Sequence, residues 1–375
     1  MEEDQKLEKS DQILRNISEI FGNSKISRYA TRIEPLDGGL CSENFLIFLT
    51  KRDPGNNEEI EELRLVYKIF DTPPLIFQVF KHIIRCAPKS SLSKWASETC
   101  DSEAEFLPLV YFLSDHIFVC KYEEHEKIPK VRLDAENIPI VAHYVAKWHK
   151  YFSPQANSNL ISRFEDCDAS GFFRRMCESF ENSIDKSENR INRGTFNYFD
   201  LMTMKDQFLA DQTKEFYEID ETLIHGDLHP LNLLLIHENN VEKSKRLKFV
   251  DFEHSLISFW QYDISMLFCN LGCISDRHNT KNPSKEFCRE FIAAYLGNRP
   301  ELQARIRDNE DYKKIVNIRF YEGLRYSCIF GLIWSFSRST VDSICHSDLD
   351  YKLYNQSMLD AVESLMIEFR DLDFV

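Results

Sequence analysis

Residues 224–232 read Ile-His-Gly-Asp-Leu-His-Pro-Leu-Asn, and the interpretation of the whole chain begins from them. An apolar run follows, and a second apolar run at residues 247–250 ends directly at Asp251. Asp227, Asn232 and Asp251 therefore stand at the ends of short strand-like runs. Phosphoryl transfer from ATP uses two carboxylates and an amide of this kind. One carboxylate accepts the proton of the attacking hydroxyl, while an amide oxygen and a second carboxylate hold magnesium on the phosphates.

The roles of these side chains follow from their order. Asp227 is the expected catalytic base, and Asn232 follows closely enough for a tight loop to present its amide oxygen to magnesium. Asp251 would supply the charged magnesium ligand, and His225 would brace the loop through backbone hydrogen bonds. Each residue alone is more simply explained as a loop polar group or a strand-end cap. Only their combination in this order favours catalysis.

Composition narrows the class of protein. A chain of 375 residues suits two packed lobes, and a net charge of −15 argues against nucleic acid or an anionic membrane as the main partner. The 11 cysteines are scattered without a CxxC pair, and we recognise no signal peptide. We therefore expect buried, reduced thiols in a cytoplasmic protein without membrane insertion.

The sequence pattern of the N-terminal part predicts β-strands. Residues 32–50 look like two strands joined near Gly38 and Gly39, which could bring backbone amides close to a phosphate. Taken alone, however, so short and common a motif favours a plain hairpin turn. The strand at residues 63–70 contains Lys68, whose amine needs an anion or a route to solvent. It is also where a lysine that binds ATP phosphates would lie.

Two further strands are expected at residues 107–113 and 116–122. The polar connector at Tyr122 and Glu123 would then be a hinge whose backbone groups bind adenine, although an ordinary strand exit is equally allowed. A kinase also needs a glutamate to pair with Lys68, and the sequence does not single one out. The candidates are Glu98, Glu103 and Glu105.

Helical spacing replaces the strand pattern from about residue 126. Residues 138–151 place apolar side chains on one helix face, and further helices are expected at residues 285–296 and 312–337. Strands first and helices after predict an α+β fold with a β-rich N-lobe and a larger, mainly α-helical C-lobe. We place a nucleotide-binding lobe at residues 1–125 and a catalytic, substrate-binding lobe at residues 126–375.

The pattern HGD-x4-N followed by VDFE resembles the protein-kinase-like superfamily, in the branch that holds aminoglycoside phosphotransferases and choline kinases. Further motifs are similar to those of the choline/ethanolamine kinase family. They are GG at residues 38–39, YDI at 262–264, FC at 268–269, GLIWS at 331–335 and LDY at 349–351. The resemblance covers roughly residues 30–370 and is most specific in the C-terminal half.

This resemblance implies a two-lobed kinase fold and an ATP- and Mg²⁺-dependent transfer of phosphate to the hydroxyl of choline or ethanolamine. The reaction would feed phospholipid head-group synthesis. A homodimer is implied by the resemblance only. Residue by residue, Asp227 would be the base, Asn232 and Asp251 would bind magnesium, Glu253 would lie near the substrate, and Asp263 would brace the catalytic loop.

The amine pocket departs from the family pattern. Trp334 and Tyr351 would line it and hold a cation through their aromatic faces. Asn270, however, stands where the family has a glutamate, Leu271 where it has a tryptophan, and His254 where it has a tyrosine. Two alternatives therefore stay open: a kinase of a different small alcohol, such as an aminoglycoside-like acceptor, and an inactive kinase fold that acts as a binding protein.

Overall fold

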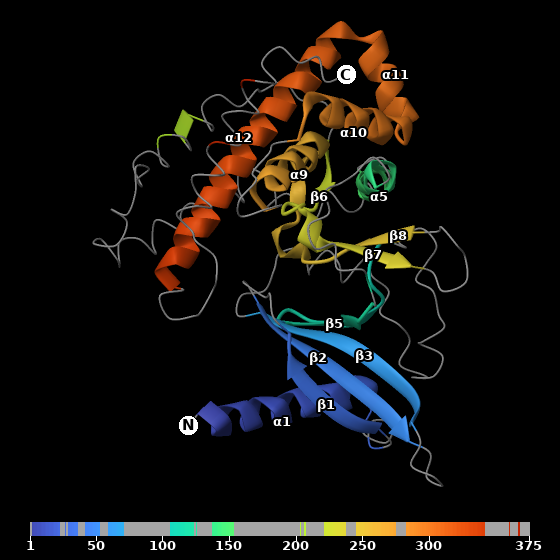
Figure 1. Ribbon diagram of the computed structural model, residues 1–375, viewed down its shortest axis with the longest axis vertical. Helices are drawn as coiled ribbons and strands as arrows, with labels where there is room; N and C mark the ends of the chain where they lie inside the picture. Colours follow the sequence, from blue (N-terminus) through green and yellow to red (C-terminus); the bar gives the residue numbers. More distant parts are fainter. Residues whose placement is uncertain are drawn as a thin grey trace. The chain divides into compact units, whose positions relative to one another are not determined.

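The structure is a computed structural model, and its contacts divide the chain into two compact units (Figure 1). The first unit contains Met1–Glu126 and Lys248–Glu253, and the second contains Lys127–Leu247 and His254–Val375. The described residues, apart from a few isolated positions, are 2–22, 29–36, 42–52, 59–70, 106–123, 137–153, 221–237, 245–274 and 283–341.

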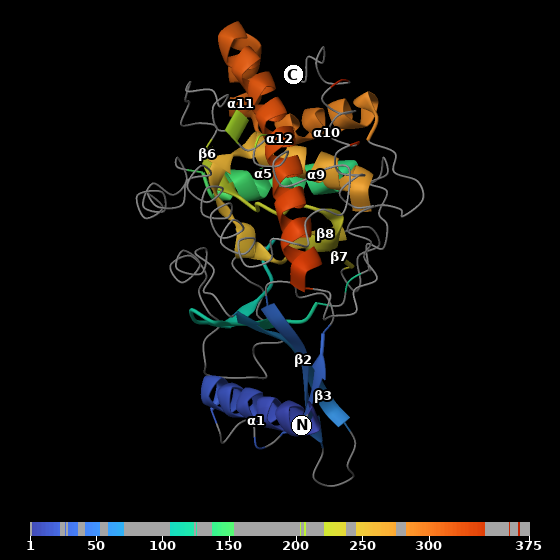
Figure 2. The same cartoon turned by 90° about the vertical axis from the view of Figure 1, so that its left-hand side faces the viewer.

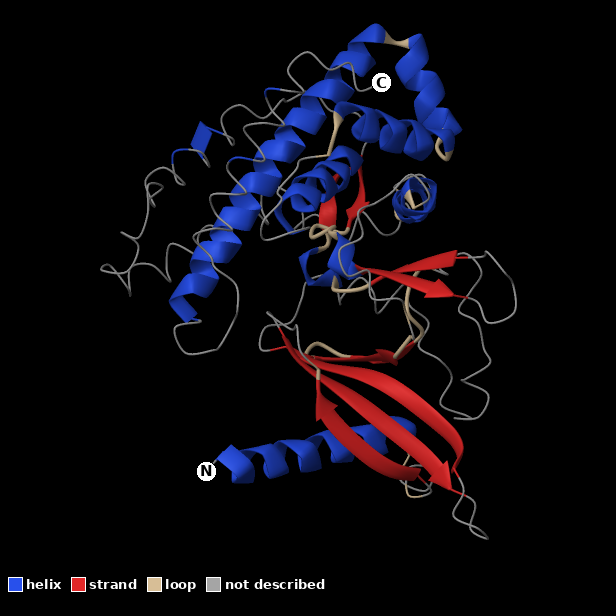
Figure 3. Ribbon diagram, viewed as in Figure 1, coloured by secondary structure: helices blue, strands red, loops and turns tan. Residues whose placement is uncertain are grey.

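The described part of the first unit contains an antiparallel sheet of five strands (Figures 1 and 3), with strand order β1-β2-β3-β5-β4. Helix α1, Glu2–Phe21, lies along one face of the sheet. The strands are β1 Tyr29–Pro35, β2 Ser42–Arg52, β3 Glu59–Phe70, β4 Val110–Leu113 and β5 Ile117–Lys121.

The alternation of side chains along each strand determines which residues lie on each face of this sheet. In β3, Leu63, Leu65 and Tyr67 are buried in the core that α1 covers, while Lys68 belongs to the alternate set of side chains. Successive side chains of a strand point to opposite faces. Lys68 therefore projects from the face opposite to α1. The amide nitrogen of Asn16 donates to the Tyr67 hydroxyl at 2.7 Å and fixes the helix on the core face.

The described residues of the second unit are mainly helical, with short strands around the HGD loop (Figures 2 and 3). Strand β6 pairs antiparallel with β9, and β7 pairs with β8, of which residues 245–247 belong to this unit. The strands are β6 Glu221–Ile224, β7 Leu233–His237, β8 Lys245–Phe249 and β9 Leu256–Phe259. The helices are α5 Ile138–Tyr151, α9 Trp260–Ile274, α10 Lys285–Gly297, α11 Pro300–Asp308 and α12 Glu310–Val341.

Helix α9 packs closely on α12 and fixes the position of Asp263. A Cβ atom added to Gly323 of α12 would lie 2.7 Å from Ser265 Oγ and 3.1 Å from the Cα of Tyr262. The Ser265 hydroxyl also donates to the Phe320 carbonyl at 3.1 Å. This close approach buries the first turns of α9, so a carboxylate at Asp263 must find its hydrogen-bond partners inside the protein.

The predicted α+β fold, with a strand-rich N-terminal region and a helix-rich C-terminal region, is confirmed. The helix expected at residues 138–151 has these same bounds in α5, and α12 extends the helix expected at residues 312–337 at both ends. The sequence did not predict α11. Among the described helices, none is long and apolar enough to span a bilayer.

Candidate active site

The site begins where strand β6 ends, at the turn formed by His225, Gly226 and Asp227. Gly226 has φ +79°, and a Cβ atom placed there would lie 2.0 Å from the carbonyl oxygen of His254. A left-handed backbone and a close carbonyl each favour glycine. The glycine of the HGD motif is therefore required by the shape of the loop rather than by its chemistry.

Asp263, in the first turn of α9, holds this loop from inside the protein. Its Oδ2 accepts the backbone N–H of His225 at 2.7 Å, and its Oδ1 accepts that of Gly226 at 3.0 Å. The Ser255 hydroxyl donates to the His225 carbonyl at 3.0 Å. Charge-assisted hydrogen bonds to a buried carboxylate are among the stronger polar contacts in proteins. The two residues before Asp227 are thus fixed through their backbone.

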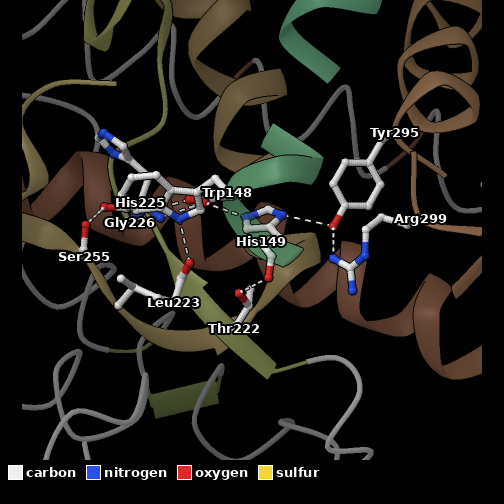
Figure 4. A network of polar contacts seen from close by, with 10 residues as sticks. Trp148, His149, Thr222, Leu223, His225, Gly226, Ser255, Tyr295 and Arg299 are labelled. Atoms are coloured by element: carbon white, nitrogen blue, oxygen red, sulfur yellow. Dashed lines mark hydrogen bonds and ion pairs between the residues drawn. The ribbon is translucent and has the colours of Figure 1, made fainter. Parts of the chain in front are cut away.

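Helix α5 ties down strand β6, which leads into the loop (Figure 4). The indole N–H of Trp148 donates to the Leu223 carbonyl at 2.7 Å, and the Thr222 hydroxyl donates to the His149 carbonyl at 2.8 Å. Leu223 returns a backbone N–H to the Phe152 carbonyl at 3.3 Å. The strand therefore reaches the loop from a rigid base, as a site that must position reacting groups requires.

Asp227 is surrounded by groups that fix its carboxylate. The amide nitrogen of Asn232 donates to the Asp227 carbonyl at 2.9 Å and to its Oδ2 at 3.2 Å. His229 Nε2 lies 3.4 Å from the same Oδ2, while its Nδ1 accepts the N–H of Leu231 at 3.2 Å and caps the short helix η2, Pro230–Asn232. Both contacts fall on Oδ2, so they set the orientation of the second oxygen, Oδ1.

Electrostatics keep this carboxylate ionised. Burial alone would raise the pKa of Asp227, but the charge and hydrogen bond of His229, followed by the charges of His254 and His225, outweigh it. The pKa therefore lies well below the ordinary value for aspartate. The side chain is still 24% exposed, so an ionised acceptor at Asp227 is accessible from outside.

These contacts distinguish the amide nitrogen of the Asn232 side chain from its oxygen. Its amide nitrogen is bound to Asp227, which leaves the side-chain oxygen as the atom that can bind a ligand. The residue is 3% exposed and is fixed by η2, whose N-cap is His229. An oxygen held in this way suits a hard cation such as magnesium.

In the first unit, Lys68 and Asp251 form an ion pair between Nζ and Oδ1. Lys68 is 11% exposed, and Asp251 has φ +63°, which a residue other than glycine rarely adopts. Strain of this kind is common at functional sites. Asp251 is thus the partner of Lys68 among the described residues, and the glutamates considered for that role (Glu98, Glu103 and Glu105) lie outside them.

The connector after β5 also contacts the segment that carries Asp251. Lys248 Nζ donates to Glu123 Oε1 at 2.7 Å, and the backbone N–H of Phe249 donates to the Phe106 carbonyl at 2.9 Å. The Tyr122 N–H donates to the Arg64 carbonyl at 2.9 Å. An ion pair and a backbone bond therefore hold residues 248–253 on the first unit. The expectation that Tyr122 and Glu123 bind adenine stays a prediction.

The remaining candidates are only partly described. Glu253 lies in the short helix η3, Phe252–His254, and is partly buried. Trp334 is part of helix α12, but its side chain lies outside the described part of the chain. Gly38, Gly39 and Tyr351 also lie outside the described residues.

Sequence reasoning overlooked His149, which is fully buried in α5. Its Nε2 lies 3.0 Å from Asp263 Oδ2, and its Nδ1 lies 3.0 Å from the Tyr295 hydroxyl (Figure 4). The signal was present, because His149 stands between Val145 and Phe152 at helical spacing in an apolar stripe. A histidine on the buried face of a helix needs polar partners.

Burial lowers the pKa of His149, although the hydrogen bond and charge of Asp263 oppose this effect. His149 is therefore protonated at a higher pH in the unfolded chain than in the folded protein. Stability should fall as the pH drops below about 6.5, the ordinary histidine pKa, with a slope of up to about 1.4 kcal/mol per pH unit. Urea unfolding of wild type and His149→Gln across this range tests the prediction. The variant should lose this part of the slope, and parallel curves would contradict it.

Comparison with known proteins gives a family match. A family model described as choline/ethanolamine kinase matches residues 128–362. A protein named probable ethanolamine kinase B, from Dictyostelium discoideum, is 29% identical over 146 residues, or 37% of this chain. The match spans 31% of the length of that relative.

Solved structures share the fold. A choline kinase from Cryptosporidium parvum has a TM-score of 0.63 at 18% identity, covering 97% of this chain and 98% of that one. An ethanolamine kinase from Plasmodium vivax has a TM-score of 0.58 at 14% identity, covering 94% of this chain and 86% of that one. At such low identity these matches establish the fold alone.

Proposed function

Because this chain belongs to the choline/ethanolamine kinase family, we propose that it transfers the γ-phosphoryl group of ATP to the hydroxyl of a small amino alcohol, choline or ethanolamine. The observation that carries the proposal is the setting of Asp227 within the matched residues. Its carboxylate is ionised, accessible and oriented through Oδ2. The product would be a phosphomonoester for phospholipid head-group synthesis.

Asp227 would act as the base. A carboxylate fixed by Asn232 and His229 can accept the hydroxyl proton of the acceptor on Oδ1 as the phosphoryl group arrives. Most of the catalysis in phosphoryl transfer comes from positioning and charge neutralisation. The rigid support of the loop by Asp263 therefore matters as much as the basicity of Asp227.

Asn232 and Asp251 fit magnesium by the chemistry of their donors. An amide oxygen and a carboxylate are hard ligands, and magnesium commonly takes one or two carboxylates, with phosphate and water completing its shell. The ion would neutralise phosphate charge, and Lys68, now paired with Asp251, would bind the phosphates.

Acceptor recognition is assigned to Glu253, Trp334 and Tyr351, an acid and two aromatic residues suited to an amine cation. Gly38 and Gly39 would approach the phosphates, and Tyr122 with Glu123 would bind adenine. A homodimer stays a prediction that rests on the family resemblance, and a cytoplasmic location stays a prediction that rests on the scattered cysteines.

An acceptor screen tests the proposal. Wild-type protein with ATP and Mg²⁺ is offered choline, ethanolamine, an aminoglycoside and an unrelated small alcohol, and ADP release is measured. We expect turnover with choline or ethanolamine and none when chelator removes Mg²⁺. Turnover with the aminoglycoside alone would show that the acceptor is an aminoglycoside rather than a small amino alcohol. A protein that binds ATP but phosphorylates none of these acceptors would overturn the proposed activity.

A further inference from the structure

A network of buried polar side chains runs from the HGD loop to the end of helix α10 (Figure 4). Asp263 contacts His149, His149 contacts Tyr295, and Arg299 Nη1 contacts the Tyr295 hydroxyl at 3.3 Å. The exposed fractions of these four residues are between 0% and 3%. Three separate stretches of sequence supply them: α5, α9 and the end of α10 with the residue that precedes α11.

The donors and acceptors around His149 can be assigned from its contact with Asp263. Both oxygens of Asp263 accept a backbone N–H, so the facing Nε2 of His149 carries the proton and donates to Oδ2. In the neutral imidazole, Nδ1 then has a lone pair, which accepts the hydroxyl hydrogen of Tyr295. Arginine has donors only, so the Tyr295 oxygen also accepts from Arg299.

The opposite tautomer would disturb the loop. With the proton on Nδ1, the lone pair of His149 Nε2 would face the Asp263 carboxylate at 3.0 Å. Both side chains are almost fully buried, so solvent would not relieve that repulsion. Asp263 is the group that accepts the backbone N–H groups of His225 and Gly226. A displaced Asp263 would therefore release the two residues that precede Asp227.

We propose that Tyr295 is a positioning residue: its hydroxyl donates to Nδ1 of His149, holds the Nε2–H group of His149 on Asp263, and so keeps Asp263 on the backbone of the HGD loop. The effect on catalysis rests on the proposed function, in which Asp227 is the base. Arg299 donates to the Tyr295 oxygen, and its Nε is fixed by Glu301 Oε1 at 2.7 Å. Tyr295 acts through His149 and Asp263 rather than by touching a reacting group.

Tyr295→Phe tests the role, because it removes the hydroxyl and keeps the ring that stacks on Trp260 with centroids 4.8 Å apart. We expect kcat to fall about 10- to 100-fold, as when a group that orients a catalytic residue is lost, with little change in KM. Tyr312→Phe is the matched control, since Tyr312 is also fully buried but is not one of the four residues of the network. A loss of kcat no greater than in the control would overturn the catalytic role.

Two measurements on folded protein need no activity. In ¹⁵N-histidine NMR, with His149→Gln assigning the signals, wild type should show the Nε2–H form with a hydrogen-bonded Nδ1, and Tyr295→Phe should shift the Nδ1 resonance toward that of a lone pair without a hydrogen bond. Hydrogen exchange at the Gly226 amide should be faster in Tyr295→Phe than in Tyr312→Phe. An unchanged Nδ1 resonance or unchanged exchange would refute the positioning role. Both changes in a protein that phosphorylates no acceptor would support it while rejecting the proposed function.

Discussion

Asp227→Asn is expected to lower kcat by about 100- to 10,000-fold, the range that a positioned general base contributes. Asparagine has the same shape but cannot accept the hydroxyl proton, and it removes the negative charge beside His229 and Asn232. The KM for ATP should change much less, because the substitution removes an interaction with the reacting hydroxyl. Initial rates with the best acceptor from the screen measure the effect.

The matched control is Asp308→Asn, an exposed acid at the end of α11 that pairs with Arg307. It removes the same charge at a position away from the loop and should retain wild-type rates. Thermal melting of both variants shows whether the protein stays folded. Turnover by Asp227→Asn close to that of Asp308→Asn would reject Asp227 as the base even if the acceptor class is right.

Gly226→Ala is expected to destabilise the second unit by about 2–5 kcal/mol and to abolish activity. The left-handed backbone costs a residue with a Cβ about 1–2 kcal/mol, and forcing extra atoms into a packed region costs about 1–3 kcal/mol more. The obstacle is the His254 backbone carbonyl, 2.0 Å from the new carbon, which cannot move aside as a side chain could.

Two other glycines separate these causes. Gly22 also has a positive φ, +90°, but its added Cβ would meet nothing within 4 Å, so Gly22→Ala should show the backbone cost alone. Gly297 has neither feature, and Gly297→Ala should be close to neutral. Urea unfolding of the three variants should rank Gly226→Ala lowest in stability. If Gly226→Ala matched Gly297→Ala, the assigned loop geometry would be wrong.

Local patterns accounted for the fold class. Alternation of side chains predicts strands, helical spacing predicts helices, and both act within a few residues. The bounds of α5 could therefore be read directly from an apolar stripe that begins at Ile138. The order of Asp227, Asn232 and Asp251 was equally visible, because each lies next to or close to a short apolar run.

Long-range pairs were not visible in this way. Lys68 contacts Asp251, which lies 183 residues later in the chain. Gly226 must be glycine partly because the carbonyl of His254 lies beside it, and the partners of His149 come from α9 and α10. No spacing rule connects such residues, since only tertiary packing brings them together.

The first unit also depends on the order in which the chain is made. Its sheet is complete in sequence by Lys121, yet Lys248–Glu253, which supplies Asp251 to Lys68, belongs to the same unit. At about 5–20 residues per second, synthesis of the intervening residues takes on the order of ten seconds. During that time a nascent sheet would present Lys68 without this carboxylate.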